Sequence, residues 1–225
     1  MGTRDRWRTM PWMVTFFGIL VIPLGVVSIY FIISQPIVIG TWSTLALVAA
    51  LAMLIMIPFA LDEVIAMGQF LAWAKRKGRP LIRTFFQGDT LEAGEMDAAD
   101  VMASPSILWA DAKRGLTMPW TLAASIALGA FLMLSRVILG NDGAMANSDH
   151  VVGALVITVA IIATAEVARA LRFINVAFGA WLVAAPFLLT GAGPLGAIVS
   201  VVVGIALIGL SLPRGKRSPE HYASW

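Results

Sequence analysis

The chain has 225 residues, of which 59% are hydrophobic and 13% are charged, and its formal net charge at pH 7 is +3. Soluble globular domains carry about 25% charged residues, so this composition excludes an ordinary soluble domain. A basic balance also occurs in nucleic-acid-binding proteins, but here the basic residues flank apolar stretches and form no basic stripe with interleaved aromatic residues. We therefore expect a membrane protein with no nucleic-acid partner.

Six apolar stretches are long enough to cross a bilayer as helices, which takes about 20 residues each. Turn-forming sequences separate them, such as Ser-Gln-Pro at 34–36 and Gly-Asn-Asp-Gly at 140–143. The predicted spans are 11–33, 42–61, 118–139, 150–168, 173–190 and 194–212. The sequence thus predicts an all-α integral membrane protein with six transmembrane helices.

The basic residues predict the orientation of these helices. With six spans, 15 of the 16 Lys and Arg residues fall on one side of the membrane, and only Arg136 falls elsewhere. Positive charge collects on the cytoplasmic side of membrane proteins. We therefore expect a multi-pass protein of the cytoplasmic (inner) membrane, with both termini and the loop 78–116 in the cytoplasm.

Residues 1–77 are predicted to form a two-helix membrane hairpin with a helical cytoplasmic extension. The stretches 35–46 and 51–58 resemble the last two helices of bacterial proteins related to vitamin K epoxide reductase. In that family a Trp-Cys-x-x-Cys motif begins the final helix, and its cysteine pair exchanges electrons with a quinone. Here Trp42 is followed by Ser43 and Ala46 at the two cysteine positions, and the chain contains no cysteine. A thiol–disulfide relay needs thiolates, so the resemblance implies a relative without redox activity.

The loop 78–116 is the one long polar region. It contains an acidic run with no Lys or Arg from Thr84 to Ala112, made of Asp89, Glu92, Glu95, Asp97 and Asp100. Such a run is typical of a solvated segment, and a docking surface for a basic partner is the alternative. Its spacing lacks the ligands of a calcium loop, so no metal site is predicted.

The C-terminal half contains a duplicated two-helix unit. Gly129-Ala-Phe-Leu recurs 50 positions later as Gly179-Ala-Trp-Leu, and Val-Val-Gly at 151–153 recurs at 202–204. An internal repeat of this period indicates one helix-pair unit used twice. With Met-Pro-Trp at 118–120, these residues resemble the SPW-repeat membrane proteins of bacteria, which implies an architecture but no function. We predict a four-helix repeat domain over 117–212, followed by a cytoplasmic tail over 213–225.

Four small residues are predicted to pack helices closely, because small side chains spaced four apart let helices approach in lipid. They are Gly129, Gly179, Ala180 and Ala184.

Four further residues are candidates for a ligand or interface contact: Trp42, Arg136, His150 and Trp181. Arg136 lies about one turn from the outer end of its helix. There its side chain could snorkel to the interface and pair with Asp142 or Asp149, or bind an anion or headgroup. His150 begins the fourth span, where it could face the membrane interface or serve as axial ligand of a haem or chlorophyll-type macrocycle.

No nucleophile elbow, phosphate-binding loop or metal-ligand cluster occurs, so we expect no enzymatic activity. The first hypothesis is a non-catalytic accessory or assembly subunit that packs against other integral membrane proteins and lipid, without a cofactor. The second is a quinone-linked redox protein in a cysteine-free or inactive form. The third is a pigment- or haem-bearing subunit, which would depend on His150.

Overall fold

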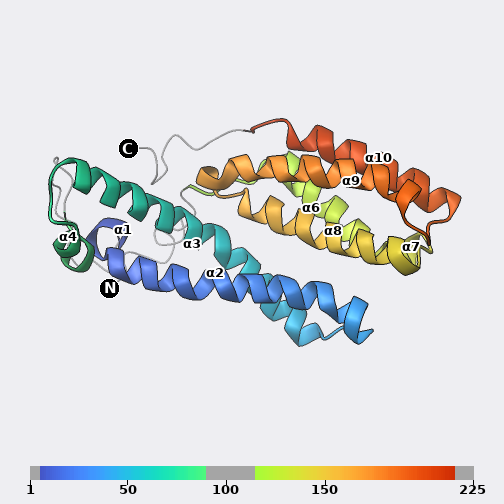
Figure 1. Ribbon diagram of the computed structural model, residues 1–225, viewed down its shortest axis with the longest axis horizontal. Helices are drawn as coiled ribbons and strands as arrows, with labels where there is room; N and C mark the ends of the chain where they lie inside the picture. Colours follow the sequence, from blue (N-terminus) through green and yellow to red (C-terminus); the bar gives the residue numbers. More distant parts are fainter. Residues whose placement is uncertain (1–5, 90–114, 216–225) are drawn as a thin grey trace.

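The computed structural model describes residues 6–89 and 115–215, and within these ranges the fold is all-helical (Figure 1). The N-terminal helices are α1 (Arg6–Thr9), α2 (Pro11–Ser34), the π-helical turn η1 (Gln35–Ile39), α3 (Thr44–Arg76) and α4 (Leu81–Gln87). The C-terminal helices are α6 (Trp120–Met133), α7 (Ser135–Ile138), α8 (Gly143–Ile162), the 3₁₀-helix η2 (Glu166–Phe173), α9 (Ile174–Leu188) and α10 (Pro194–Ser211).

Several of these helices are apolar and long enough to cross a membrane. Five candidate spans occur among the described residues: Pro11–Ile39, Thr44–Arg76, Gly143–Ile162, Glu166–Leu188 and Pro194–Ser211. The apolar helix α6 is shorter, with 14 residues. Many large apolar side chains on these helices are exposed, which in water would be costly. The chain is therefore a membrane protein whose apolar helices contact lipid.

Two of the predicted helices differ from the structure. The span expected at 118–139 is divided at Leu134, which leaves the helical conformation between α6 and α7. The span expected at 150–168 begins earlier, at Gly143, and ends at Ile162. It ends there because residues 164–166 bond instead to the segment before α6: the Thr117 amide donates to the Thr164 carbonyl at 3.0 Å. The helical extension predicted beyond residue 61 is present, since α3 continues to Arg76.

The loop expected over 78–116 begins with a helix. Pro80 precedes α4, and the Leu-Ile-Arg-Thr-Phe-Phe-Gln sequence of α4 is more apolar than a solvated loop. The acidic docking surface predicted in this loop falls mostly on residues outside the described ranges. Of its acidic residues only Asp89 is described, and it pairs with Arg79 at 2.7 Å.

The long helices pack as three hairpins: α2 with α3, α6 with α8, and α9 with α10. In the first hairpin glycine allows close contact, since a Cβ at Gly18 would lie 2.7 Å from Val64 Cγ2. The α2–α3 hairpin packs along α8, and Figure 1 shows it extending beyond the four-helix unit at the end that carries α4.

The four-helix unit has a core made of matching positions from its two hairpins. Its buried residues are Leu132, Val152, Val156, Leu182, Val203 and Leu207. These residues form three pairs along the sequence. Leu132 and Leu182, in the first helix of each hairpin, are 50 residues apart. In the second helix, Val152 and Val203, and likewise Val156 and Leu207, are 51 residues apart. Each hairpin thus contributes three buried residues to one core.

Candidate helix-docking groove

The α2–α3 hairpin covers one face of α8. Ile161 and Ile162 of α8 pack against a cluster that includes Val21 of α2 and Leu54 and Ile57 of α3. These are aliphatic contacts between helices, with no charge among them. This face of α8 is therefore a docking surface for a pair of apolar helices.

His150 adds a polar contact to the same interface. Its Nε2 donates to the Ile32 carbonyl of α2 at 3.1 Å, and its ring meets Trp42 edge-on, with centroids 5.4 Å apart. The side chain is buried. The structure places the ring between α2 and α8, beside Trp42.

We expect His150→Leu to lower the free energy of unfolding by about 1–2 kcal/mol, because the Ile32 carbonyl would lose its side-chain donor in a partly buried place. Reversible unfolding in mixed micelles by increasing SDS would measure this. His150→Gln, which keeps a donor, is the control and should lower the free energy of unfolding less. Equal stability of all three proteins would contradict a role for this bond in holding α2 to α8.

The corresponding face of α10 is open. When the sequence of α8 is aligned with that of α10, 51 residues later, Ala154 corresponds to Ile205 and Thr158 to Gly209. Ala154 is 4% exposed, whereas Ile205 is 60% exposed. Thr158 is buried, whereas Gly209 is exposed. The face that carries the hairpin on α8 therefore has an uncovered counterpart on α10.

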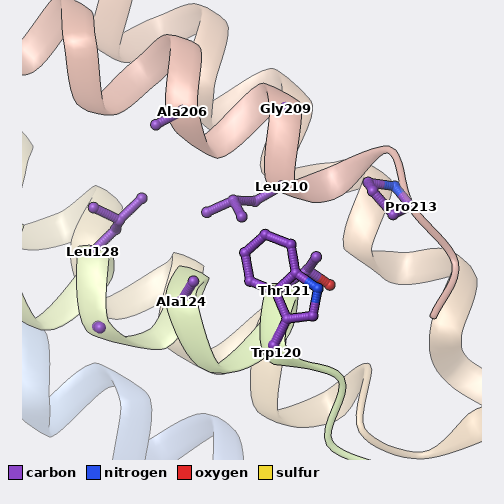
Figure 2. A pocket seen from close by; sticks show the side chains of 9 residues that line it. Trp120, Thr121, Ala124, Leu128, Ala206, Gly209, Leu210 and Pro213 are labelled. Atoms are coloured by element: carbon purple, nitrogen blue, oxygen red, sulfur yellow. The ribbon is translucent and has the colours of Figure 1, made fainter. Parts of the chain in front are cut away.

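A groove of about 590 Å³ lies beside this open face, between α6 and α10 (Figure 2). It is lined by Trp120, Thr121, Ala124, Ala127, Leu128, Ala206, Gly209, Leu210 and Pro213. Four of these residues are alanine or glycine, and Figure 2 shows the Trp120 ring between the two helices, beside Leu210. Small residues allow a helix to approach closely in lipid, where packing holds helices together.

Two buried arginines of η2 tie together the helix ends near the groove. Arg169 donates to the carbonyl oxygens of Thr117 at 3.1 Å, Thr164 at 3.4 Å and Arg214 at 3.4 Å, and also to the Thr117 hydroxyl. Arg172 donates to the Arg169 carbonyl at 2.9 Å. These bonds join the start of α6, the end of α8 and the segment after α10.

Asp62 of α3 reaches the same region. Its side chain is buried and neither carboxylate oxygen has a hydrogen-bond partner. It lies against Gly115, where an added Cβ would be 2.6 Å from Oδ2 and where φ is +80°. Both the space and the backbone conformation therefore require glycine at this position.

The two positions that match the family cysteines lie together at the start of α3. Ser43 caps this helix, since its Oγ accepts from the Ala46 amide at 3.4 Å. The Ser43 amide in turn donates to Gln35 Oε1 at 2.7 Å. Ser43 and the neighbouring Trp42 are exposed. The two positions that the resemblance aligns with the cysteine pair therefore hold a hydroxyl and a methyl group.

Arg136 is exposed and donates to Asn147 Oδ1 at 3.0 Å. This amide takes the place of the expected partners Asp142 and Asp149. Asp149 is buried and accepts instead from Asn141 Nδ2 at 2.8 Å. One of the two aspartates predicted to pair with Arg136 therefore makes a buried contact instead.

The remaining predicted residues divide between the interior and the surface. Trp181 is exposed, and its indole N–H donates to Ser148 Oγ at 2.9 Å. Ala180 is exposed and Ala184 is half-buried. The close helix contact of α9 is made by Gly179, which lies against α10.

Two family models match separate parts of the chain. The SPW repeat domain matches residues 119–213, and the Vitamin K epoxide reductase family matches residues 1–61. The class defined by these matches and by the fold is a multi-helix membrane protein. This chain is similar to the reductase family in its first hairpin and to the SPW repeat domain in its four-helix unit, so both predicted resemblances are confirmed. No curated protein and no solved structure matches it.

The groove was not singled out from the sequence. Its lining comes from α6 and α10, which are far apart in the chain, and no local pattern joins them. The available signal was the spacing of small residues, which also marks many ordinary helix contacts. The hydrogen bonds of Arg169 and Arg172 were not predicted either, because in the sequence both residues look like ordinary charges that flank a span.

Proposed function

We propose that the chain is a non-catalytic accessory or assembly subunit that binds a transmembrane helix of another membrane protein in the groove between α6 and α10. One observation carries the proposal. The face that accepts the apolar α2–α3 hairpin on α8 has an open counterpart on α10, with Ile205 exposed where Ala154 is buried. The proposed ligand is accordingly an apolar helix without charges, with small residues where it meets Gly209.

The proposal includes a duplicated repeat, supported by one contact that occurs twice. A Cβ at Gly129 would lie 2.8 Å from the Gly153 carbonyl oxygen, and one at Gly179 would lie 2.6 Å from that of Gly204. Matching glycines therefore bring the two helices of each hairpin together. Two copies of one hairpin would present two similar outer faces, and the chain uses one of them for its own first hairpin.

It also includes six spans in a bacterial inner membrane, with both termini in the cytoplasm. We take α6 and α7 as one span, because only Leu134 separates them. The distribution of basic residues supports this topology. Five spans would place part of the Lys and Arg residues on the outer side.

Absence of catalysis is proposed because the positions of the redox pair carry Ser43 and Ala46, and the chain has no cysteine. Ser43 has a structural role there as the cap of α3. Residues 6–89 and 115–215 contain no group of three or more His, Asp or Glu side chains that could hold a metal ion. We propose no cofactor for this subunit.

The lack of cysteine allows a direct test. In the native membrane, Ala206→Cys would give this chain a single thiol, which a benzophenone maleimide would label. We expect light to cross-link it to one other integral membrane protein. Adding Gly209→Leu should reduce this adduct about fivefold or more, because overfilling a packed contact costs about 1–3 kcal/mol.

Phe187→Cys is the matched control, because Phe187 is exposed on α9 away from the groove. It should label lipid and give no specific protein adduct. Equal protein adducts from both positions would overturn the proposal, as would an adduct that Gly209→Leu leaves unchanged. An adduct of two copies of the chain would show self-association and contradict an accessory role.

A further inference from the structure

The helix α4 lies at the level where the first membrane span begins. The amide of Asp89, just after α4, donates to the Arg8 carbonyl at 3.1 Å. Gly88, with φ of +73°, packs directly on the backbone of Thr9. Both partners stand immediately before Pro11, the first residue of α2. Because spans begin at the headgroup level, α4 is placed at the membrane surface.

The outward side of α4 is apolar. Ile82 is 79% exposed and Phe86 is 62% exposed, and Leu81 is exposed as well. Three large apolar side chains on a helix of seven residues are costly in water. At the headgroup level they would be buried among acyl chains, as the apolar face of an interfacial helix is.

A second groove, of about 410 Å³, lies between α4 and the end of α3. Its lining residues are Leu71, Ala72, Lys75, Leu81, Ile82, Phe85 and Phe86. Lys75 is the one charged residue of this lining. The groove therefore combines an apolar wall with a single cation.

The charge around this groove is positive and largely uncompensated. Lys75, Arg76 and Arg83 are exposed, and none of them forms an ion pair within the described part of the chain. Arg83 donates to the neutral side chain of Gln87 at 2.9 Å, which leaves its charge in place. Arg79 differs, because it pairs with Asp89.

We propose that the groove between α3 and α4 binds one anionic phospholipid of the adjacent leaflet. An acyl chain lies against the aromatic and aliphatic wall, and the headgroup phosphate meets the Lys75 ammonium. Charge complementarity selects an anionic lipid over a zwitterionic one, because basic residues near the membrane surface attract anionic headgroups. This site is separate from the groove between α6 and α10, so either proposal can fail alone.

The test is native mass spectrometry of the full-length chain from nanodiscs of equal parts dioleoylphosphatidylglycerol and dioleoylphosphatidylcholine. We expect one phosphatidylglycerol to be retained per chain. Lys75→Gln should weaken its binding about fivefold, as expected for the loss of one cation near an anionic headgroup. Phe86→Ala, which removes part of the apolar wall, should weaken it too.

Arg214→Gln is the matched control, since Arg214 is exposed and lies outside the lining of this groove. It should leave retention unchanged. Equal retention of both lipids, or no retained lipid, would overturn the proposal. So would a Lys75→Gln protein that binds like the parent, or an equal loss in Arg214→Gln, which would mean that the attraction is general rather than local.

Discussion

Replacing Arg169 by methionine is expected to lower the free energy of unfolding by about 3 kcal/mol or more. Arg169 is 1% exposed and donates to the Thr117, Thr164 and Arg214 carbonyl oxygens. Methionine has similar length and no donor, so the bonds to three carbonyl oxygens and to the Thr117 hydroxyl would be lost, at about 1 kcal/mol each. The gain from removing a buried charge is smaller, because the guanidinium is already well bonded.

Unfolding by SDS in mixed micelles would measure this loss. Arg136→Met is the control, because Arg136 is exposed and makes one side-chain bond, to Asn147. Its effect should stay within about 0.5 kcal/mol. Arg169→Lys should lower the free energy of unfolding by an amount between those of Arg169→Met and Arg136→Met. An ammonium keeps the charge but not the planar arrangement of donors. If Arg169→Met were as stable as the parent, the bonds at η2 would not hold the helix ends together.

Alanine at Gly179 is expected to destabilise the protein by about 1–3 kcal/mol, because it overfills the contact between α9 and α10. The new Cβ would lie 2.6 Å from the Gly204 carbonyl oxygen and 3.3 Å from the Ile208 amide nitrogen, both backbone atoms that cannot rotate away. Helix propensity acts in the opposite direction, by about 1 kcal/mol at most. The steric cost is therefore expected to exceed it.

The same substitution at Gly68 separates the two effects. An added Cβ at Gly68 of α3 meets nothing within 4 Å. Gly68→Ala should thus be neutral or stabilising by up to about 1 kcal/mol in the same unfolding assay. Equal effects at the two positions would contradict the close approach of α9 and α10.

Gly129 extends this experiment to the proposed repeat. Its Cβ would meet the Gly153 carbonyl oxygen and the Ile157 side chain, as that of Gly179 would meet Gly204 and Ile208. Gly129→Ala should therefore cost as much as Gly179→Ala, within the error of about 0.5 kcal/mol. A neutral Gly129→Ala beside a damaging Gly179→Ala would mean that the two hairpins are not equivalent.

The sequence by itself determined the class of protein and its two family resemblances. Long apolar runs predict membrane helices because a helix satisfies its backbone hydrogen bonds within one segment, as lipid requires. The recurrence of Gly129 as Gly179 marked the contacts at which helices come together. Serine and alanine at positions 43 and 46 predict that the chain lacks a thiol–disulfide relay, and this prediction needs no knowledge of the fold. Each of these conclusions follows from local composition or from a repeated pattern.

Tertiary structure decided what composition leaves open. Ala154 and Ile205 occupy matching positions, yet one is buried and the other exposed, because the first hairpin packs on α8 and not on α10. Arg169 has the sequence context of a flanking charge, and its burial depends on carbonyl groups brought from three distant segments. In apolar helices every face looks suitable for lipid, so only contacts between distant parts of the chain determine which faces are covered.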